Sequence, residues 1–107
     1  MSVSTHVLDA VHGTPATGVG LAVVDEHGDV VTTGITDEEG RAKELLPDDA
    51  LAGVYTLVFD TAAYFEQSGT QTFYPEVSIT FTVRDVDAHH HVPLLLSPFA
   101  YSTYRGS

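Results

Sequence analysis

The sequence lacks cysteine and is poor in positive charge, with only four Lys and Arg among 107 residues. Without cysteine the chain has no disulfide, no thiol nucleophile and no cysteine-based zinc site. Four cations against 15 Asp and Glu give a formal net charge of −11, so the chain cannot form the basic patch that binds nucleic-acid phosphates. Anionic membrane surfaces repel such a chain for the same reason. We therefore expect no nucleic acid and no membrane among its partners.

Long apolar runs are also absent. No stretch approaches the ~18 apolar residues of a membrane-spanning helix, and the first residues show neither the basic nor the apolar region of a signal peptide. We therefore expect a cytoplasmic protein. Hydrophobic residues make up 43% of the chain, which is enough for a core, and the length is near that of one domain. We predict a single domain over residues 1–107.

The acidic residues occur in short clusters at predicted turns, at 25–26, 37–39 and 48–49. Two interpretations stay open. Proteins that work in concentrated salt often carry such an excess, because salt screens the repulsion among carboxylates. The alternative is an acidic face for a basic partner. Scattered charge favours solvation over docking, so we favour salt adaptation.

Apolar periodicity predicts strands along most of the chain. Residues 77–84 alternate between apolar and polar side chains, which is typical of a strand with one buried face. Residues 54–59 form a β-branched and aromatic run that fits a strand covered on both faces. Runs at 21–24 and 30–33 flank turn residues and predict a hairpin. Residues 5–11 alternate as well.

One segment, Thr61 to Gly69, contains helix-forming residues instead. Asp60 or Thr61 is suited to cap its start, and Gly69 to end it. Strands at short spacing with one short helix predict an all-β, two-sheet sandwich.

Six histidines occur in the chain, and His89, His90 and His91 are consecutive. In a strand, His89 and His91 share a face while His90 points the other way. Such a pair, completed by a third ligand such as His6, is one way to hold zinc. The alternative is an edge strand without metal, and by spacing alone we favour it.

The end of the sequence carries a recognisable pattern. Residues 92–107 stay apolar and aromatic almost to the last position, so we expect this segment to be packed, in this subunit or in a neighbour. Its ending, Tyr104-Arg105-Gly106-Ser107, follows His89-x-His91-Val92-Pro93-Leu94-Leu95-Leu96-Ser97-Pro98. Together these segments closely resemble the C-terminal signature of the 5-hydroxyisourate hydrolases, the transthyretin-related enzymes of urate breakdown.

Matches elsewhere extend the resemblance over essentially the whole chain. Ser4-Thr5-His6-Val7-Leu8-Asp9 and Gly13-x-Pro15-Ala16 resemble the N-terminal signature of the family. Asp37-x-x-Gly40-Arg41, Tyr64-Phe65 and residues 73–77 follow in the family's order. The main departure is His90, where the family more often has Tyr.

The resemblance implies a transthyretin-like sandwich of about eight strands with one short helix. It implies a homotetramer with active sites at the dimer–dimer interface. The implied reaction is hydrolysis of the cyclic amide of 5-hydroxyisourate to 2-oxo-4-hydroxy-4-carboxy-5-ureidoimidazoline, without metal or organic cofactor. The implied catalytic residues are His6, Arg41, His91 and Ser107, and the implied substrate-binding residues are Tyr104, Arg105 and Gly106.

These residue types suit the reaction. Amide hydrolysis needs an activated water and a stabilised oxyanion. A histidine titrates near neutrality, so His6 or His91 can act as the general base, and the sequence leaves both open. Arg41 is a permanent cation that can polarise the carbonyl, and Arg105 and Ser107 would orient the substrate or the water.

A transthyretin-like carrier of small ligands, without hydrolase activity, is the alternative. The resemblance implies that carriers lack both the first histidine and the Tyr-Arg-Gly-Ser tail. Both features are present in this sequence as His6 and residues 104–107, so we favour the enzyme.

Overall fold

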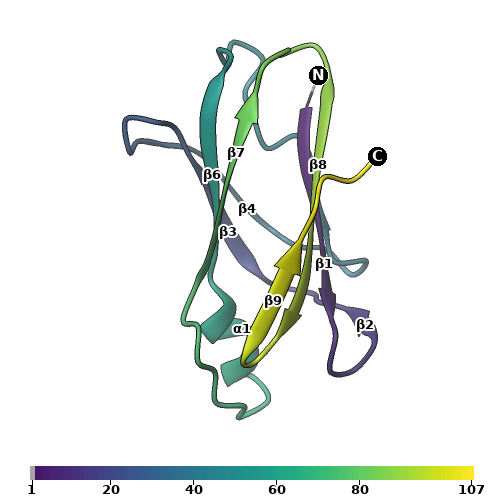
Figure 1. The fold of residues 1–107 in the computed structure, drawn as a ribbon. Coiled ribbons are helices and arrows are strands. Elements are labelled where there is room, and N and C mark those ends of the chain that lie inside the picture. The colour runs from purple at the N-terminus through teal and green to yellow at the C-terminus, as the bar shows by residue number, and fades with distance from the viewer. Residues whose placement is uncertain (1) are drawn as a thin grey trace.

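A computed structural model describes residues 2–107 and shows two β-sheets packed face to face, with one short helix at the lower end (Figure 1). The all-β, two-sheet prediction is therefore confirmed. In chain order the elements are β1 (Ser2–Asp9), β2 (Thr14–Pro15), β3 (Gly20–Val24), β4 (Val30–Ile35), β5 (Arg41–Ala42), β6 (Gly53–Phe59), α1 (Thr61–Glu66), β7 (Val77–Val83), β8 (His89–Ser97) and β9 (Ala100–Thr103).

The two sheets differ in how their strands are joined. One has the order β4-β3-β6-β7, with neighbouring strands antiparallel. The other has the order β2-β1-β8-β9, and β5 also pairs with β1. Its central pair, β1 and β8, runs parallel, so the first described strand lies directly beside one of the last.

Alternating side chains of both sheets form the core between them. From the sheet that contains β1 and β8, Val7 and Leu94 are fully buried, and Leu57 and Phe59 of β6 meet them from the other sheet. The predicted hairpin is confirmed, because β3 and β4 pair antiparallel around the turn at 25–29. The expectation that residues 54–59 are covered on both faces is wrong within this chain, because alternate residues of β6 stay partly exposed.

Helix α1 begins where the sequence predicts and ends earlier. The Asp60 carboxylate caps its start by accepting from the Ala63 N–H. At its end the N–H groups of Ser68 and Thr70 both donate to the Phe65 carbonyl, at 3.1 and 3.0 Å, and replace the next helical turn with a tight turn that reaches Gly69. With six residues, the one helix found within residues 2–107 is too short to cross a membrane.

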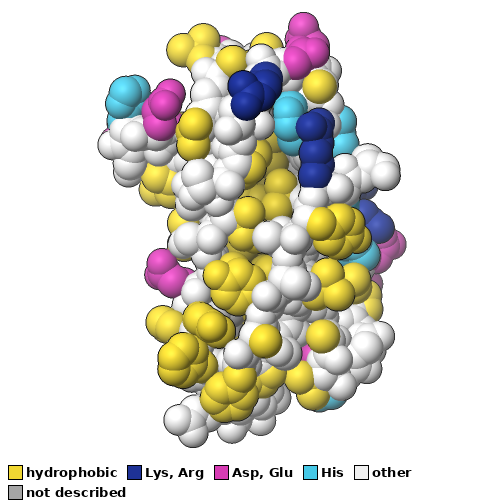
Figure 2. Space-filling model, viewed as in Figure 1, with side chains coloured by type: hydrophobic (Ala, Val, Ile, Leu, Met, Phe, Trp, Pro, Cys, Tyr) yellow, Lys and Arg dark blue, Asp and Glu magenta, His cyan; other side chains and the backbone are white. Residues whose placement is uncertain are grey.

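Strands β7 and β9 are each an edge strand of their sheet, and they lie on the same side of the molecule. Exposed apolar side chains gather on this side (Figure 2). Tyr101 of β9 packs edge-on against Tyr74, with ring centroids 5.3 Å apart, yet both rings stay at least 36% exposed. Residues 92–96 of β8 are largely packed in the core, as expected, whereas β9 is exposed within this chain.

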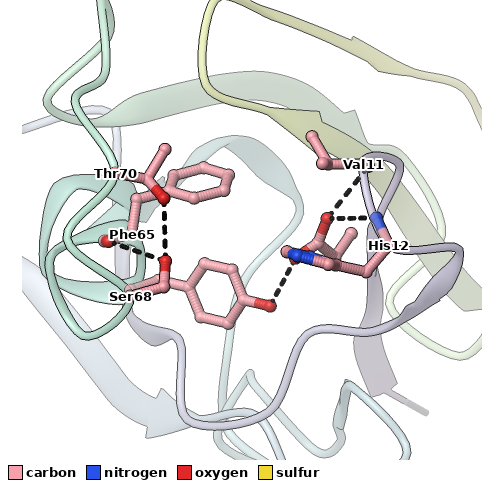
Figure 3. A network of polar contacts seen from close by, with 7 residues as sticks. Val11, His12, Phe65, Ser68 and Thr70 are labelled. Atoms are coloured by element: carbon pink, nitrogen blue, oxygen red, sulfur yellow. Dashed lines mark hydrogen bonds and ion pairs between the residues drawn. The ribbon is translucent and has the colours of Figure 1, made fainter.

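Asp9, the last residue of β1, ties this strand to the turn that follows and to helix α1. Figure 3 shows this network of polar contacts from close by, with Val11 and His12 of the turn labelled. One carboxylate oxygen accepts from the N–H groups of Val11 and His12, at 3.0 and 3.1 Å. The other oxygen accepts from His12 Nδ1 at 2.9 Å and from the Tyr64 hydroxyl at 2.8 Å. Asp9 is only 2% exposed, so these bonds take the place of water around the charge.

The contact between Asp9 and Tyr64 changes the pKa of both side chains. Burial alone raises the pKa of Asp9, but the bonds from His12, Tyr64 and the neighbouring N–H groups together lower it below the usual 3.8. Burial and the bond to Asp9 raise the pKa of Tyr64 to about 12. Asp9 is therefore ionised in the folded protein, and its charge stabilises the fold.

We expect Asp9→Asn to lower the free energy of unfolding by about 2–3 kcal/mol, because the N–H and O–H groups that donate to the buried carboxylate lose their charged acceptor. Tyr64→Phe removes one bond and should cost about 1 kcal/mol. Because folding lowers the pKa of Asp9, its contribution is present above the unfolded pKa of about 3.9 and is lost as pH falls through the folded value. Urea unfolding at pH 7 and at pH 3 measures both effects.

The exposed Asp29→Asn serves as the control and should change stability little. A difference between wild type and Asp9→Asn that is as large at pH 3 as at pH 7 would contradict this role of the Asp9 charge.

Candidate functional site

Three of the predicted site residues meet on the outer face of the sheet that contains β1, β5 and β8. In the β1–β5 pair, His6 lies opposite Arg41. In the parallel β1–β8 pair, Ser4 lies opposite His91. Directly opposed residues share a face with Cβ atoms about 5 Å apart, and Ser4 and His6 share a face because side chains alternate along a strand. His6, Arg41 and His91 therefore form one cluster, which we call the His–Arg face.

The β1 strand sends its other side chains into the core. Val3, Thr5 and Val7 are fully buried between the sheets, which leaves Ser4 and His6 for the outer face. This alternation keeps the His6 side chain on the outer face, because turning the strand over would expose the apolar side chains.

The turn before Arg41 is built to bring that residue against β1. The Asp37 carboxylate accepts from the N–H groups of Glu39 and Arg41, at 2.9 and 3.0 Å. Gly40 adopts φ = +75°, and its carbonyl accepts from the Val7 N–H at 2.7 Å. A Cβ atom at position 40 would clash with the Val7 carbonyl oxygen. The Asp37-x-x-Gly40-Arg41 motif therefore places Arg41 beside His6.

The Arg41 guanidinium is held only weakly. Within residues 2–107 it forms an ion pair with Glu39, in which Nε lies 3.9 Å from Oε1, and the two side chains are 40% and 79% exposed. Such a surface pair is worth at most about 1 kcal/mol. The guanidinium is thus available to an anionic or carbonyl oxygen on the His–Arg face.

His91 is held by a residue that the sequence analysis missed. Ser4 Oγ lies 2.8 Å from His91 Nδ1 and 3.1 Å from His89 Nε2. The two imidazole rings are stacked with centroids 6.2 Å apart. Ser4 opens the N-terminal family signature, but the resemblance assigns it no role, and its proximity to His91 depends on the β1–β8 register.

The surroundings of His91 favour its neutral form. Burial is the main cause that lowers the pKa of His91, and the charges of Arg41, His89 and His6 lower it further. A neutral imidazole at neutral pH can accept a proton. Because Nδ1 is engaged by Ser4, Nε2 is the nitrogen left for water or a ligand.

The tail lies directly on the His91 ring. The Gly106 N–H donates to the His91 carbonyl at 2.8 Å, and the two residues form an isolated antiparallel bridge. A Cβ atom on Gly106 would clash with His91 Cδ2 and come within 3.1 Å of Pro93 Cγ. Glycine is required here because the backbone approaches the ring so closely.

The remaining tail residues fall into two cavities. Ser107, Arg41, His91 and Ser4 line a cavity of about 310 Å³ on the His–Arg face. Tyr104 and Arg105 line another, of about 250 Å³, which also includes His90 and β7 residues. His91 lines both. Within one chain, Arg105 and Tyr104 therefore do not line the cavity that holds Arg41 and Ser107. The two cavities are neighbours, and Figure 2 shows histidine and basic side chains close together near the C-terminus.

The three consecutive histidines are arranged as expected for a strand. His89 and His91 share the outer face, while His90 points the other way, is 8% exposed and places Nδ1 3.1 Å from the Ala88 carbonyl. Within residues 2–107, no group of three or more His, Asp or Glu side chains is placed to hold a metal ion. The zinc alternative therefore lacks a third ligand among these residues.

Comparisons with known proteins give a consistent result. The model of the HIUase/Transthyretin family matches residues 3–106. A 5-hydroxyisourate hydrolase of Salmonella dublin is 44% identical over 108 residues, which cover 97% of this chain and 79% of that protein. The structure of Klebsiella pneumoniae 5-hydroxyisourate hydrolase superposes with a TM-score of 0.90 at 35% identity, covering 99% of this chain and 93% of that one.

A second solved structure is equally similar in fold. Sea bream transthyretin in complex with thyroxine superposes with a TM-score of 0.89 at 35% identity, covering 97% of this chain and 93% of that one.

We expect Arg41→Gln to raise the pKa of His91, because the substitution removes a positive charge that disfavours the imidazolium. An NMR titration of the His91 ring protons measures this value without relying on activity. Lys43→Gln, which removes a charge from the same cavity, is the matched control and should shift the pKa less. A His91 pKa that is unchanged or lower in Arg41→Gln would contradict the electrostatic contact between the two residues.

Proposed function

Because this chain belongs to the HIUase/Transthyretin family, we propose that it is a hydrolase that opens the cyclic amide of 5-hydroxyisourate. Relatives and a structural neighbour with that activity in their names support an enzyme. The product in this proposal is 2-oxo-4-hydroxy-4-carboxy-5-ureidoimidazoline. The reaction needs no metal or organic cofactor in this proposal, and the cytoplasmic location stays a prediction from the sequence.

The observation that carries the proposal is the meeting of His6, Arg41 and His91 on one sheet face. We assign His91 as the general base. Its lowered pKa keeps the imidazole neutral, and Ser4 at Nδ1 leaves Nε2 to take the proton of an attacking water. His6 lies close enough to lower the pKa of His91, and we assign it to positioning the water and the ring.

The negative charge that develops on the substrate oxygen needs a cation to stabilise it. When water attacks the amide carbonyl, the oxygen becomes an oxyanion, and a fixed cation beside it lowers the barrier. We assign this role to Arg41, since its guanidinium is held only by an exposed contact to Glu39. Ser107, in the same cavity, orients the substrate or the water.

We assign Tyr104, Arg105 and Gly106 to substrate binding within a homotetramer whose sites lie at the dimer–dimer interface. Gly106 packs on the His91 ring. Tyr104 and Arg105 line a different cavity of the same chain, so in this proposal assembly completes the site around them.

Two features support association of the chains. The edge strands β7 and β9 carry unpaired backbone groups, which favours pairing with another chain. Exposed apolar side chains also surround these edges, namely Phe73, Tyr74, Phe99, Tyr101 and Tyr104.

The carrier alternative has the same fold, and fold alone does not choose between the two. Sea bream transthyretin superposes as well as the Klebsiella hydrolase does, at the same 35% identity. The polar cluster favours the enzyme, because a base and a cation on one face are what amide hydrolysis needs.

The proposal is tested by generating 5-hydroxyisourate in situ from urate and urate oxidase and following its absorbance decay. We expect this protein to accelerate the decay, and His91→Ala to lose about 100-fold or more of kcat, the usual contribution of acid–base catalysis. His27→Ala, at an exposed turn histidine, is the control. Decay at the spontaneous rate, in low and in high salt, would contradict the hydrolase and favour the carrier.

The tail is tested in the same assay. We expect deletion of residues 105–107 to abolish activity while the fold persists, because these residues lie outside β9 and the core. Gly106→Ala keeps the tail length but places a Cβ atom against the His91 ring, so we expect kcat to fall about tenfold or more. Circular dichroism checks folding, and full activity in the deletion would show that the tail is not part of the site.

A further inference from the structure

Ser4 lies between two imidazoles, and the proposed reaction assigns no proton transfer to Ser4 or to His89. Its hydroxyl is within hydrogen-bond distance of His91 Nδ1 and His89 Nε2 at once, at 2.8 and 3.1 Å. Ser4 is 7% exposed, so the protein rather than bulk water supplies its partners. His89, in contrast, is an exposed residue.

The chemistry of a hydroxyl makes this arrangement directional. A serine has one proton to donate, so it donates to one imidazole and accepts from the other. When His91 carries its proton on Nδ1, it donates to Ser4, and Ser4 donates to His89 Nε2. When Ser4 donates to His91 Nδ1, it accepts from His89 Nε2–H. The protonation states of the two rings are therefore linked through Ser4.

We propose that Ser4 and His89 form a proton relay with His91, in which Ser4 passes a proton between the half-buried imidazole at the site and the exposed imidazole at the rim. This inference rests on the proposed function. Ser4 and His89 are positioning residues, since neither touches the reacting atoms.

The relay balances within one turnover. As water attacks, its oxygen forms the C–O bond and its proton moves to His91 Nε2. The Nδ1 proton of His91 moves to Ser4 Oγ, and the hydroxyl proton of Ser4 moves to His89 Nε2. As the C–N bond breaks, the two relay protons return, so that His91 Nδ1 is protonated again while the leaving nitrogen takes the proton from His91 Nε2. All three residues then regain their starting state, and His91 is never left without a proton.

The charges around the cluster give the relay a purpose. An imidazolium at His91 is half-buried and close to Arg41 and His6, which makes the positive charge costly there. The cavity that contains His91 is also lined by Lys43, a further cation, and by Glu44, which supplies a carboxylate. Passing the charge to His89 moves it to an exposed ring that water solvates, so His91 can hold the proton from the water without retaining the positive charge.

The test compares the steady-state kinetics of wild type, Ser4→Ala, Ser4→Thr and His89→Gln. We expect Ser4→Ala and His89→Gln each to lower kcat about tenfold or more, with KM within about twofold, because only proton transfer is impaired. Ser4→Thr keeps the hydroxyl and should retain most activity. The double variant should be no slower than either single one, because both substitutions break the same relay.

Two further measurements separate a relay from simple packing. A proton inventory in H₂O and D₂O mixtures should be curved for wild type and linear for Ser4→Ala, because several protons move in the first case only. The ¹⁵N shifts of His91 should change in Ser4→Ala, even without substrate. Ser102→Ala and His27→Gln, at exposed positions that do not contact His91, are the matched controls.

The relay is overturned by a wild-type kcat in Ser4→Ala or in His89→Gln, or by a linear inventory in wild type. Failure of the proposed function looks different, since wild type itself would then not accelerate the decay of 5-hydroxyisourate. In that case the ¹⁵N shifts still test the contact between Ser4 and His91, because unchanged His91 shifts in Ser4→Ala would show that the two side chains are not coupled.

Discussion

The parallel pairing of β1 with β8 is the constraint on which the site depends. It sets Ser4 opposite His91 and His6 opposite Pro93, although these residues are almost the full chain length apart. A shift of one residue would turn Ser4 and His6 into the core and expose Val3 and Val7, which are fully buried. Burial of the apolar face thus holds the polar face in register, so the same interaction that stabilises the sheet also positions the site.

Backbone contacts rather than ion pairs complete the site. Gly40 brings Arg41 against β1 through a bond to Val7, and Gly106 lets the tail lie on the His91 ring. Both positions exclude a side chain for steric reasons, so the site tolerates little change at either glycine. Because the ion pair of Arg41 with Glu39 is exposed and long, one of only four cations in a chain of charge −11 stays available for a ligand.

Much of the fold follows from local pattern. Short stretches of sequence predict three features that the structure confirms. These are the strand at 77–84, the hairpin around 25–29 and the start of the helix at Thr61. The helix end was predicted too late, because two N–H groups turn back onto the Phe65 carbonyl. Both faces of the strand at 54–59 were predicted to be covered, but one face of β6 is partly exposed in this chain. Apolar side chains alone do not show whether another element packs on a given face of the sheet. The contact between Ser4 and His91 was missed, because it depends on the pairing of two strands 87 residues apart and a serine in a strand does not by itself indicate such a role.

The sequence by itself determined the chemistry that is available and the family to which it belongs. Its histidines, its four cations and its terminal tetrapeptide are all visible without coordinates. Only the tertiary structure decided which of these groups share a surface. It joins His6, Arg41 and His91, sets Ser107 beside them, and sends Arg105 to another cavity. The reason is physical: pairing between distant strands is chosen by burial of the whole core, and no short segment contains that information.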